Sequence, residues 1–283
     1  MLRIVMDGAG DMPEGWAEAY DIHVIPINIQ FKDQSFLQGV DLSNEQFYDV
    51  VQANGMIPKT SQPTPYQFIE FYKRIAQVGD TILSLHVTSK LSGTFESAKI
   101  AAKELQDRFT IIPFDTGAGS AAMGYMVREA RILERTGASL QVILDRMRFI
   151  SRNVSIILTL NTLDYARMSG RVKALQATIA SMLNVKPIVV LRDGMLNVSE
   201  KVRTRQKSLE RVIARIKERF DDLPINVAVV QARDEQAGAS LIDQVKKCLN
   251  CRELILTELS IGVAANLGPG TVGIVAYPVE EGH

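Results

Sequence analysis

Short apolar segments alternate with helical segments through the first 160 residues, and this alternation limits the fold more than any other feature. Between the apolar segments lie stretches of helical periodicity with recognisable ends. The expected strands are Leu2–Met6, Ile22–Phe31, Thr81–Val87, Thr110–Phe114 and Val154–Leu160. Alternating β and α segments of this kind are typical of a mostly parallel sheet with helices on both faces. We therefore expect a Rossmann-like, three-layer α/β domain over residues 1–160.

The helical segments carry local start and stop signals. Ser43 with Gln46 predicts a capping box, and Thr64 with Gln67 predicts a second one that has Pro65 in the first turn. A further helix is expected over Ser120–Arg135, ending at Gly137, and Ser139 is expected to cap the next. These signals fix where helices begin, independently of the strands.

The second half has a different pattern. Asp193-Gly194 between two apolar runs predicts a β-hairpin. A charged helix is expected over Gln206–Phe220. The remaining elements, expected as strand, helix, strand and strand, are Asn226–Gln231, Glu235–Leu249, Glu253–Leu259 and Val272–Tyr277. A hairpin plus separated helices suggests an α+β, two-layer domain with a mixed or antiparallel sheet over residues 161–283.

Composition excludes several classes of protein. Thirty-two basic and thirty-two acidic residues cancel, which argues against a nucleic-acid-binding surface. No apolar run is long enough to span a membrane and no signal peptide is evident, so we expect a cytoplasmic protein. Cys248 and Cys251 form an isolated C-x-x-C, and the three histidines show no ligand spacing, so no metal or other cofactor is expected. His86 is expected to be a satisfied core residue.

Two hydroxyl-rich segments stand before expected helices. The first is 58–65, where Thr60 and Ser61 lie between prolines that are expected to exclude regular structure. Its simplest interpretation is a stiff loop that ends in the Thr64 cap. The second segment is 88–98, which leaves a strand and enters a helix.

The second segment is typical of an anion site. Helix N-terminal N–H groups attract negative charge, Gly93 allows close approach of the backbone, and Ser92 and Thr94 add hydroxyl donors. A nucleophilic serine would need a base, and neither Gly-x-Ser-x-Gly nor a histidine partner is evident. The segment therefore favours anion binding over catalysis.

Other polar residues admit two interpretations each. Asp7 and Asp115 follow expected parallel strands, where they can bind a metal or, more commonly, accept backbone N–H bonds that brace the loops. Lys201, Arg203 and Arg205 alternate as if on one face of a strand, which can be a solvated edge or can supply an arginine to the anion. The glycine-rich segment 266–273 lacks the features of a nucleotide loop.

Taken in order, five segments resemble the DegV family. They span nearly the whole chain. They are Thr60-Ser61-Gln62-Pro63 with Pro65, Leu91-Ser92-Gly93-Thr94 with Ser97-Ala98, Leu163 and Tyr165 with Ser169-Gly170-Arg171-Val172, Leu183-Asn184-Val185-Lys186-Pro187-Ile188, and Gly268-Pro269-Gly270-Thr271-Val272-Gly273. Three positions depart from the family pattern: Gly8 replaces a serine, Asn266 a histidine and Ser169 a glycine.

The resemblance implies a function and a set of site residues. Family members bind a long-chain fatty acid in a tunnel between two α/β domains, and bacterial members serve as the carrier subunit of a fatty acid kinase. By this match Thr60 or Ser61, with Ser92 and Gly93, hold the carboxylate, and Arg171 and Arg203 lie near it. The supporting shell is expected to be Asp7, Thr94, Asp115, Asn266 and Gly268.

The leading hypothesis is thus a non-catalytic carrier that binds one long-chain fatty acid and presents it to a kinase partner. Burial of a methylene stabilises binding by about 0.8 kcal/mol, so the tail supplies affinity while hydrogen bonds to the carboxylate fix its orientation. Two alternatives remain open at this point. One is a serine-dependent acyl hydrolase or transferase that uses Ser92 or Thr60, and the other is a lipid-sensing regulatory module.

Overall fold

A computed structural model of the chain describes residues 1–173 and 185–280. It divides into two compact units. Unit 1 comprises Met1–Ser151 and Ser260–Ala265, and unit 2 comprises Arg152–Leu259 and Asn266–His283. No helix among the described residues is long and apolar enough to cross a membrane.

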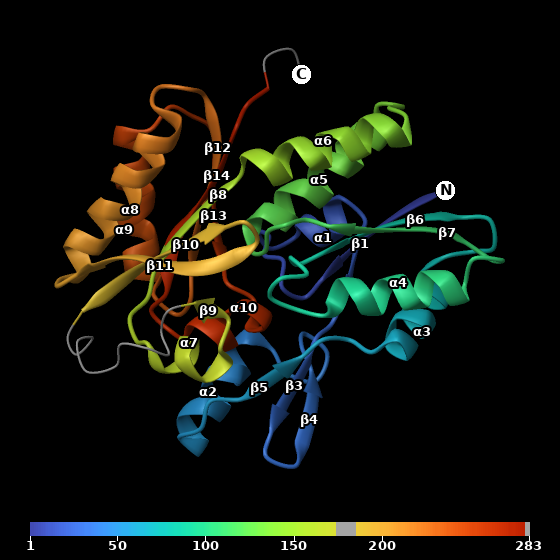
Figure 1. The fold of residues 1–283 in the computed structure, drawn as a ribbon, viewed down its shortest axis with the longest axis horizontal. Coiled ribbons are helices and arrows are strands. Elements are labelled where there is room, and N and C mark those ends of the chain that lie inside the picture. Colours follow the sequence, from blue (N-terminus) through green and yellow to red (C-terminus); the bar gives the residue numbers. More distant parts are fainter. Residues whose placement is uncertain (174–184, 281–283) are drawn as a thin grey trace. The chain divides into compact units, whose positions relative to one another are not determined.

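Unit 1 contains a four-stranded parallel sheet in the order β2-β1-β6-β7. Its strands are β1 (Leu2–Asp7), β2 (Ile22–Ile25), β6 (Thr81–His86) and β7 (Thr110–Asp115). The helices are α1 (Trp16–Ala19), α2 (Asn44–Asn54), α3 (Pro65–Ile75), α4 (Thr94–Glu104), α5 (Ala121–Arg135) and α6 (Leu140–Asn153). Figure 1 shows α3 and α4 on one side of this sheet and α5 and α6 on the other, which confirms the parallel-sheet α/β prediction.

The capping signals in unit 1 are confirmed. Ser43 and Thr64 each accept from the N–H three residues on, and both partner glutamines bond back to the cap backbone. Gly137 follows α5 with φ +82°, and the Ser139 hydroxyl accepts from Val142 N at 3.4 Å.

The expected single strand Ile22–Phe31 is wrong, because the chain breaks at Pro26. Proline lacks the N–H that a continuing ladder needs. β2 ends at Ile25, and β3 (Asn28–Phe31) joins a separate antiparallel sheet, in the order β4-β3-β5. Its other strands are β4 (Gln34–Leu37) and β5 (Lys59–Ser61).

Unit 2 contains a seven-stranded mixed sheet in the order β13-β12-β14-β8-β10-β11-β9. Its strands are β8 (Ser155–Thr159), β9 (Val172–Lys173), β10 (Lys186–Arg192), β11 (Met195–Val202), β12 (Ile225–Gln231), β13 (Cys251–Glu258) and β14 (Val272–Pro278). The hairpin prediction is confirmed: β10 pairs with β11 across Asp193 and Gly194, both at positive φ. β8, which the sequence pattern grouped with the first half, pairs with β14 and β10 in this sheet.

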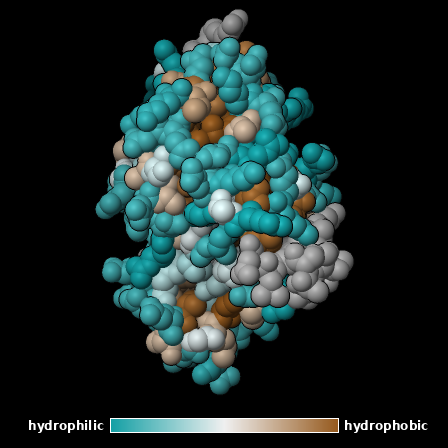
Figure 2. Space-filling model, turned by 90° about the vertical axis from the view of Figure 1, so that its left-hand side faces the viewer, coloured by the Kyte–Doolittle hydropathy of each residue, from teal (hydrophilic) through white to brown (hydrophobic). Residues whose placement is uncertain are grey.

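Two long helices cover one face of the unit 2 sheet. They are α8 (Arg205–Phe220) and α9 (Glu235–Cys248), and their apolar sides form one core with β10, β12 and β14. Two shorter helices are α7 (Asp164–Ser169) and α10 (Ile261–Leu267). The face of the molecule seen in Figure 2 is mainly hydrophilic, with apolar atoms in small separate areas, as is usual for a globular surface.

Candidate functional site

At the start of α4, the second hydroxyl-rich sequence motif coincides with a helix end that no side chain caps. Gly93 is the N-cap residue, and no side chain caps the helix. Ser97 N donates to Gly93 O at 3.0 Å. The N–H groups of the turn before Ser97 have no side-chain cap as acceptor. The hydroxyls of Ser92 and Thr94 lie 2.8 Å apart beside it. The arrangement presents several hydrogen-bond donors, which suits an anion.

Thr60 and Ser61 lie on β5, so the expectation that their prolines exclude regular structure is wrong. Only positions 58, 63 and 65 are proline, and the four residues between the first two, three of which form β5, keep the backbone N–H groups that a strand requires. Thr60 pairs with Ile29 and Ser61 with Asn28. Because paired residues share a face and neighbours alternate, the two hydroxyls point to opposite sides of the sheet.

Gln62 connects the two hydroxyl-rich segments. A Cβ built on Gly93 would lie 2.5 Å from Gln62 Nε2 and 3.0 Å from its Cδ, so the amide packs directly on the glycine. The main-chain oxygen of Gln62 accepts from Asn28 Nδ2 at 3.1 Å. The same Asn28 nitrogen also donates to Gln67 Oε1 at the start of α3. The structure therefore places the Gln62 side chain against Gly93, and this is the contact that joins the two segments among the described residues.

Asp7 and Asp115 brace neighbouring loops at the carboxyl edge of the parallel sheet. Asp7 is fully buried and accepts from Ala9 N and Val87 N, each at 2.9 Å. Asp115 accepts from Ser89 N at 3.3 Å and Gly117 N at 3.0 Å. These are the backbone contacts that the bracing interpretation expects. Among residues 1–173 and 185–280, no group of three metal-ligating side chains is present.

His86 is only partly the satisfied core histidine expected from the sequence. Its Nδ1 lies 3.3 Å from Asp7 Oδ2, but its Nε2 is buried without a hydrogen-bond partner. The ring lies edge-on to Phe68, with centroids 5.3 Å apart. On the same side, the Tyr72 hydroxyl donates to Ser84 at 2.9 Å, and burial raises the pKa of this tyrosine. These contacts join Tyr72 of α3 to Ser84 of β6, and His86 at the end of β6 to Asp7 at the end of β1.

Gly8, the first departure from the family pattern, is enclosed on two sides. Gln38 Nε2 donates to Gly8 O at 2.9 Å, and Gln38 Oε1 would be 2.5 Å from a Cβ on Gly8. A Cβ on Gly262 would be 2.5 Å from Gly8 O. Gln38 thus fills the space that a side chain on residue 8 would need.

Of the unit 2 candidates, Arg171 and Asn266 lie at the end of α7. Ser169 Oγ donates to Asn266 O at 3.3 Å, so these two departures from the family pattern are in direct contact. Arg171 follows Gly170, and its guanidinium donates to Ser169 O. Asn266 is in α10, whose last two residues belong to unit 2.

The glycine-rich segment packs on the chain that follows β8. Gly268 has φ +87°, and a Cβ there would be 2.7 Å from the Tyr165 ring. Burial and then the Asp164 carboxylate raise the pKa of Tyr165. Lys186, the lysine of the fourth family-like segment, donates from Nζ to Asn161 Oδ1 at 2.6 Å, so it also contacts the chain that follows β8. Leu183 and Asn184, also part of that motif, lie outside the described residues.

The expected strand face of Lys201, Arg203 and Arg205 is wrong. β11 ends at Val202, and Thr204 caps α8 by accepting from Lys207 N at 3.2 Å. Arg205 is therefore helical and pairs with Asp234 at 2.6 Å. Arg203 is exposed in the turn and makes no hydrogen bond or ion pair with the Arg171 segment among the described residues.

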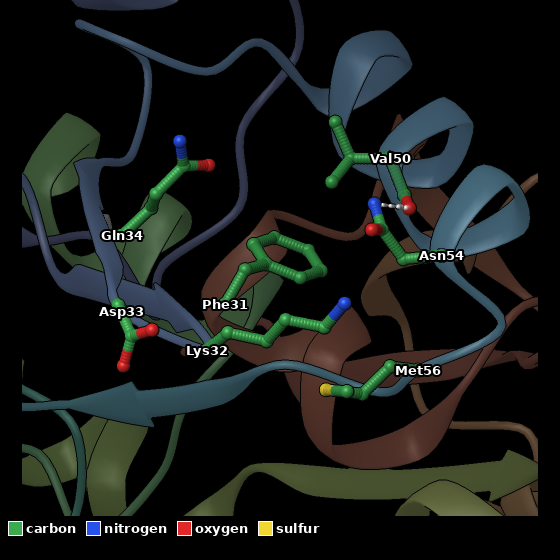
Figure 3. A pocket seen from close by; sticks show the side chains of 7 residues that line it. All are labelled: Phe31, Lys32, Asp33, Gln34, Val50, Asn54 and Met56. Atoms are coloured by element: carbon green, nitrogen blue, oxygen red, sulfur yellow. Dashed lines mark hydrogen bonds between the residues drawn. The ribbon is translucent and has the colours of Figure 1, made fainter.

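A separate pocket of about 400 Å³ lies between the β3–β4 turn and the end of α2 (Figure 3). Phe31, Val50 and Met56 form apolar walls, while Lys32 extends across the pocket towards α2. None of the site residues expected from the sequence lines it. This pocket is therefore distinct from the predicted head-group residues.

Sequence reasoning missed Gln62 and Gln38 as parts of the site. Gln62 stood in a recognised motif, and its place two residues after Thr60 could have indicated a shared side. Gln38 gave no local signal, because its contact with Gly8 joins positions thirty residues apart in sequence.

Comparison with known proteins agrees with the fold. The family model described as the uncharacterised DegV family matches residues 1–279. A DegV domain-containing protein of Deinococcus radiodurans is 30% identical over 98% of this chain and 99% of its own. A Thermus thermophilus structure described as fatty acid binding of a DegV family protein has 28% identity and a TM-score of 0.90, covering 98% and 99% of the two chains.

Bacillus subtilis DegV, described as a fatty acid binding protein, has 26% identity and a TM-score of 0.85, with 98% and 99% covered. Its fold and that of the Thermus protein are reproduced over nearly the full length of both chains. The chain described here belongs to the DegV family.

Proposed function

We propose that this protein binds one long-chain fatty acid and holds its carboxylate at the start of α4. The observation that carries the proposal is the contact of Gln62, next to Thr60 and Ser61 in sequence, with Gly93 at a helix end that no side chain caps. Fatty acid binding by the Thermus and Bacillus relatives supports the choice of ligand. A buried carboxylate needs several hydrogen bonds, and this end offers N–H groups and hydroxyls together.

Thr60 is the better candidate for the second hydroxyl. It shares its side of the sheet with fully buried Ile29, whereas Ser61 is exposed on the side of Asn28. Arg171, Arg203 and Asn266 stay predictions as head-group residues, and so does a tunnel between the two units.

A hydrolase that uses Ser92 fits the geometry less well. The Ser92 hydroxyl forms a hydrogen bond with the Thr94 hydroxyl. His86, whose Nδ1 lies 3.3 Å from the Asp7 carboxylate, is fully buried and packs edge-on to Phe68. A general base must reach the proton that it removes. We therefore propose that the protein acts as a carrier and contributes no catalytic residues of its own.

We extend the proposal to a partner: the bound acid is presented to a separate fatty acid kinase. This step rests on the family resemblance. Incubation with such a kinase, ATP and palmitate should yield acyl phosphate only when the protein is present. Binding of palmitate with no acyl phosphate would favour the lipid-sensing alternative.

The binding step is tested by native mass spectrometry of protein purified from its host. We expect a mass increment that matches a long-chain fatty acid, weakened or lost in Ser92→Ala. Thr60→Val should weaken it as well, and Ser61→Ala should not. Turnover of an acyl ester that disappears in Ser92→Ala would contradict the carrier proposal.

A further inference from the structure

β13 forms one edge of the unit 2 sheet, because it pairs with β12 on one side and ends the strand order. Leu259 N donates to Gln231 O of β12 at 2.8 Å. Successive residues of a strand direct their N–H and C=O groups to opposite sides, so residues 254, 256 and 258 direct theirs away from β12. Among residues 1–173 and 185–280, the outward groups of Leu254 and Leu256 have no hydrogen-bond partner. β13 therefore presents an open edge.

β13 lacks the features by which the other edge strands avoid pairing with a second chain. β7 carries Pro113, which has no N–H to donate, and β2, β4, β5 and β9 each have four described residues or fewer. β13 has eight residues and contains neither proline nor lysine. Its register with β12 shifts only at the start, between Ile225 and Asn226, and is regular from Glu253 onward. A long edge strand of this kind is a template for pairing with another strand.

The side chains on the α9 side of β13 are apolar in the middle of the strand and charged at its ends. Leu254 packs against the core under α9, and Leu256 lies beside Gly238 of α9 with 42% of its surface exposed. Arg252 at one end is exposed, and Glu258 at the other end is half-buried. Opposite charges at the two ends make the edge complementary to a strand of the same sequence that runs in the opposite direction.

Antiparallel pairing of β13 with β13 of a second copy is limited to a few registers. The outward N–H and C=O groups form hydrogen bonds only when even-numbered residues stand opposite even-numbered residues. A pair centred on Leu254 places Arg252 opposite Leu256, and a pair centred on Leu256 places Leu254 opposite Glu258. A pair centred on Ile255 instead places Leu254 opposite Leu256, and it places Arg252 opposite Glu258. Of these three registers, this one matches apolar with apolar side chains and opposite charges with each other, and such cross-strand pairs are stabilising.

We propose that two copies of this protein associate through β13, with the two strands antiparallel and centred on Ile255. The two seven-stranded sheets then continue into each other across the contact. A two-fold contact uses the same surface on both copies, so each cross-strand pair occurs twice. This association is independent of the fatty acid proposed above, because it uses no residue at the start of α4.

The association is tested by sedimentation equilibrium of the full-length protein from micromolar to submillimolar concentration. We expect the mass to rise from 31.3 kDa towards twice that value as the concentration increases. Arg252→Glu places like charges opposite each other at both ends of the contact and should raise the dimer Kd roughly tenfold or more. Glu258→Arg should do the same, and the double variant should return the Kd close to that of the unaltered protein. Leu256→Lys, which introduces the residue that natural edge strands use against pairing, should also raise the Kd.

Lys207→Glu, an equal charge reversal at an exposed residue of α8, is the matched control and should change the Kd less than about twofold. A constant mass across the concentration range would overturn the proposal. So would a dimer that Arg252→Glu and Lys207→Glu weaken equally, or a double variant that stays as weak as its parents. Far-UV circular dichroism during urea unfolding shows whether each variant is folded. If either charge variant fails to fold, an unchanged Kd in Leu256→Lys contradicts the pairing and a raised Kd supports it.

Discussion

Alanine at Gly124 sets helix propensity against the packing of α5 on the loop that follows β1. Gly124 is the fourth residue of α5, and a Cβ there would lie 2.1 Å from Asp11 O and 3.1 Å from the Asp11 carbonyl carbon. Unstrained contact needs about 3.5 Å, so α5 and the loop after β1 would have to separate by roughly 1.4 Å. Overpacking costs about 1–3 kcal/mol, and alanine's helix preference returns about 1 kcal/mol. We therefore expect a net loss of about 1 kcal/mol or more in the free energy of unfolding.

Gly238 provides the matched control, because it is the fourth residue of α9. Its nearest neighbours are side-chain atoms of Gln231 and Leu256 at 3.2–3.4 Å, which can move. Gly238→Ala should be neutral or stabilising by up to about 1 kcal/mol.

Urea unfolding measures both effects. Trp16 is the one tryptophan of the chain, and its ring centroid lies 6.0 Å from that of Tyr125 in α5. Its fluorescence therefore reports on the unit that contains Gly124. Far-UV circular dichroism follows both variants. A Gly124→Ala protein as stable as the unaltered one, or shifted like Gly238→Ala, would refute the packing argument.

Three further changes test other contacts. Thr64→Ala removes the cap that accepts from Gln67 N at 3.2 Å and should cost about 1 kcal/mol in urea unfolding; an unchanged midpoint would contradict the cap's role. Gly268→Ala forces alanine to φ +87° and against Tyr165, so a loss above about 1 kcal/mol is expected by circular dichroism, and a neutral result would be evidence against the close approach. The Gln77 N–H, the Met1 ammonium and Arg3 lower the pKa of Asp80 to about 2. A carboxyl group whose pKa is lower in the folded protein stabilises the fold at pH values above its unfolded pKa, and this stabilisation is lost as the pH falls towards 2. Asp80→Asn should therefore make the free energy of unfolding depend less on pH between about pH 4 and 2. An unchanged pH dependence in the variant would contradict this expectation.

The local signals of the sequence predicted the helices well. Ser43, Thr64, Gly137 and the Asp193-Gly194 turn each act within a few residues, so their effect can be recognised without knowledge of the fold. The small sheet of β3, β4 and β5 was missed for the opposite reason. Its pairing of Thr60 with Ile29 joins residues far apart in the chain, and neither strand is long.

The candidate site shows the same division. The prediction of an anion site at 92–94 came from a strand, a glycine and a helix in sequence, and the start of α4 has no side-chain cap. Which of Thr60 and Ser61 shares the buried side of the small sheet with Ile29 depends on strand pairing, and the contacts of Gln62 and Gln38 form only across the fold. Long-range packing of this kind leaves no periodic signal in a single sequence.

The central claim is that a fatty acid carboxylate lies at the start of α4. It is tested most directly by the carbon-13 NMR signal of palmitate labelled at its carboxyl carbon and bound to the full-length protein. We predict one bound resonance, distinct from free palmitate, that shifts in Ser92→Ala and in Thr60→Val but not in Ser61→Ala. A bound resonance that none of these substitutions moves, or no bound resonance at all, would contradict the claim.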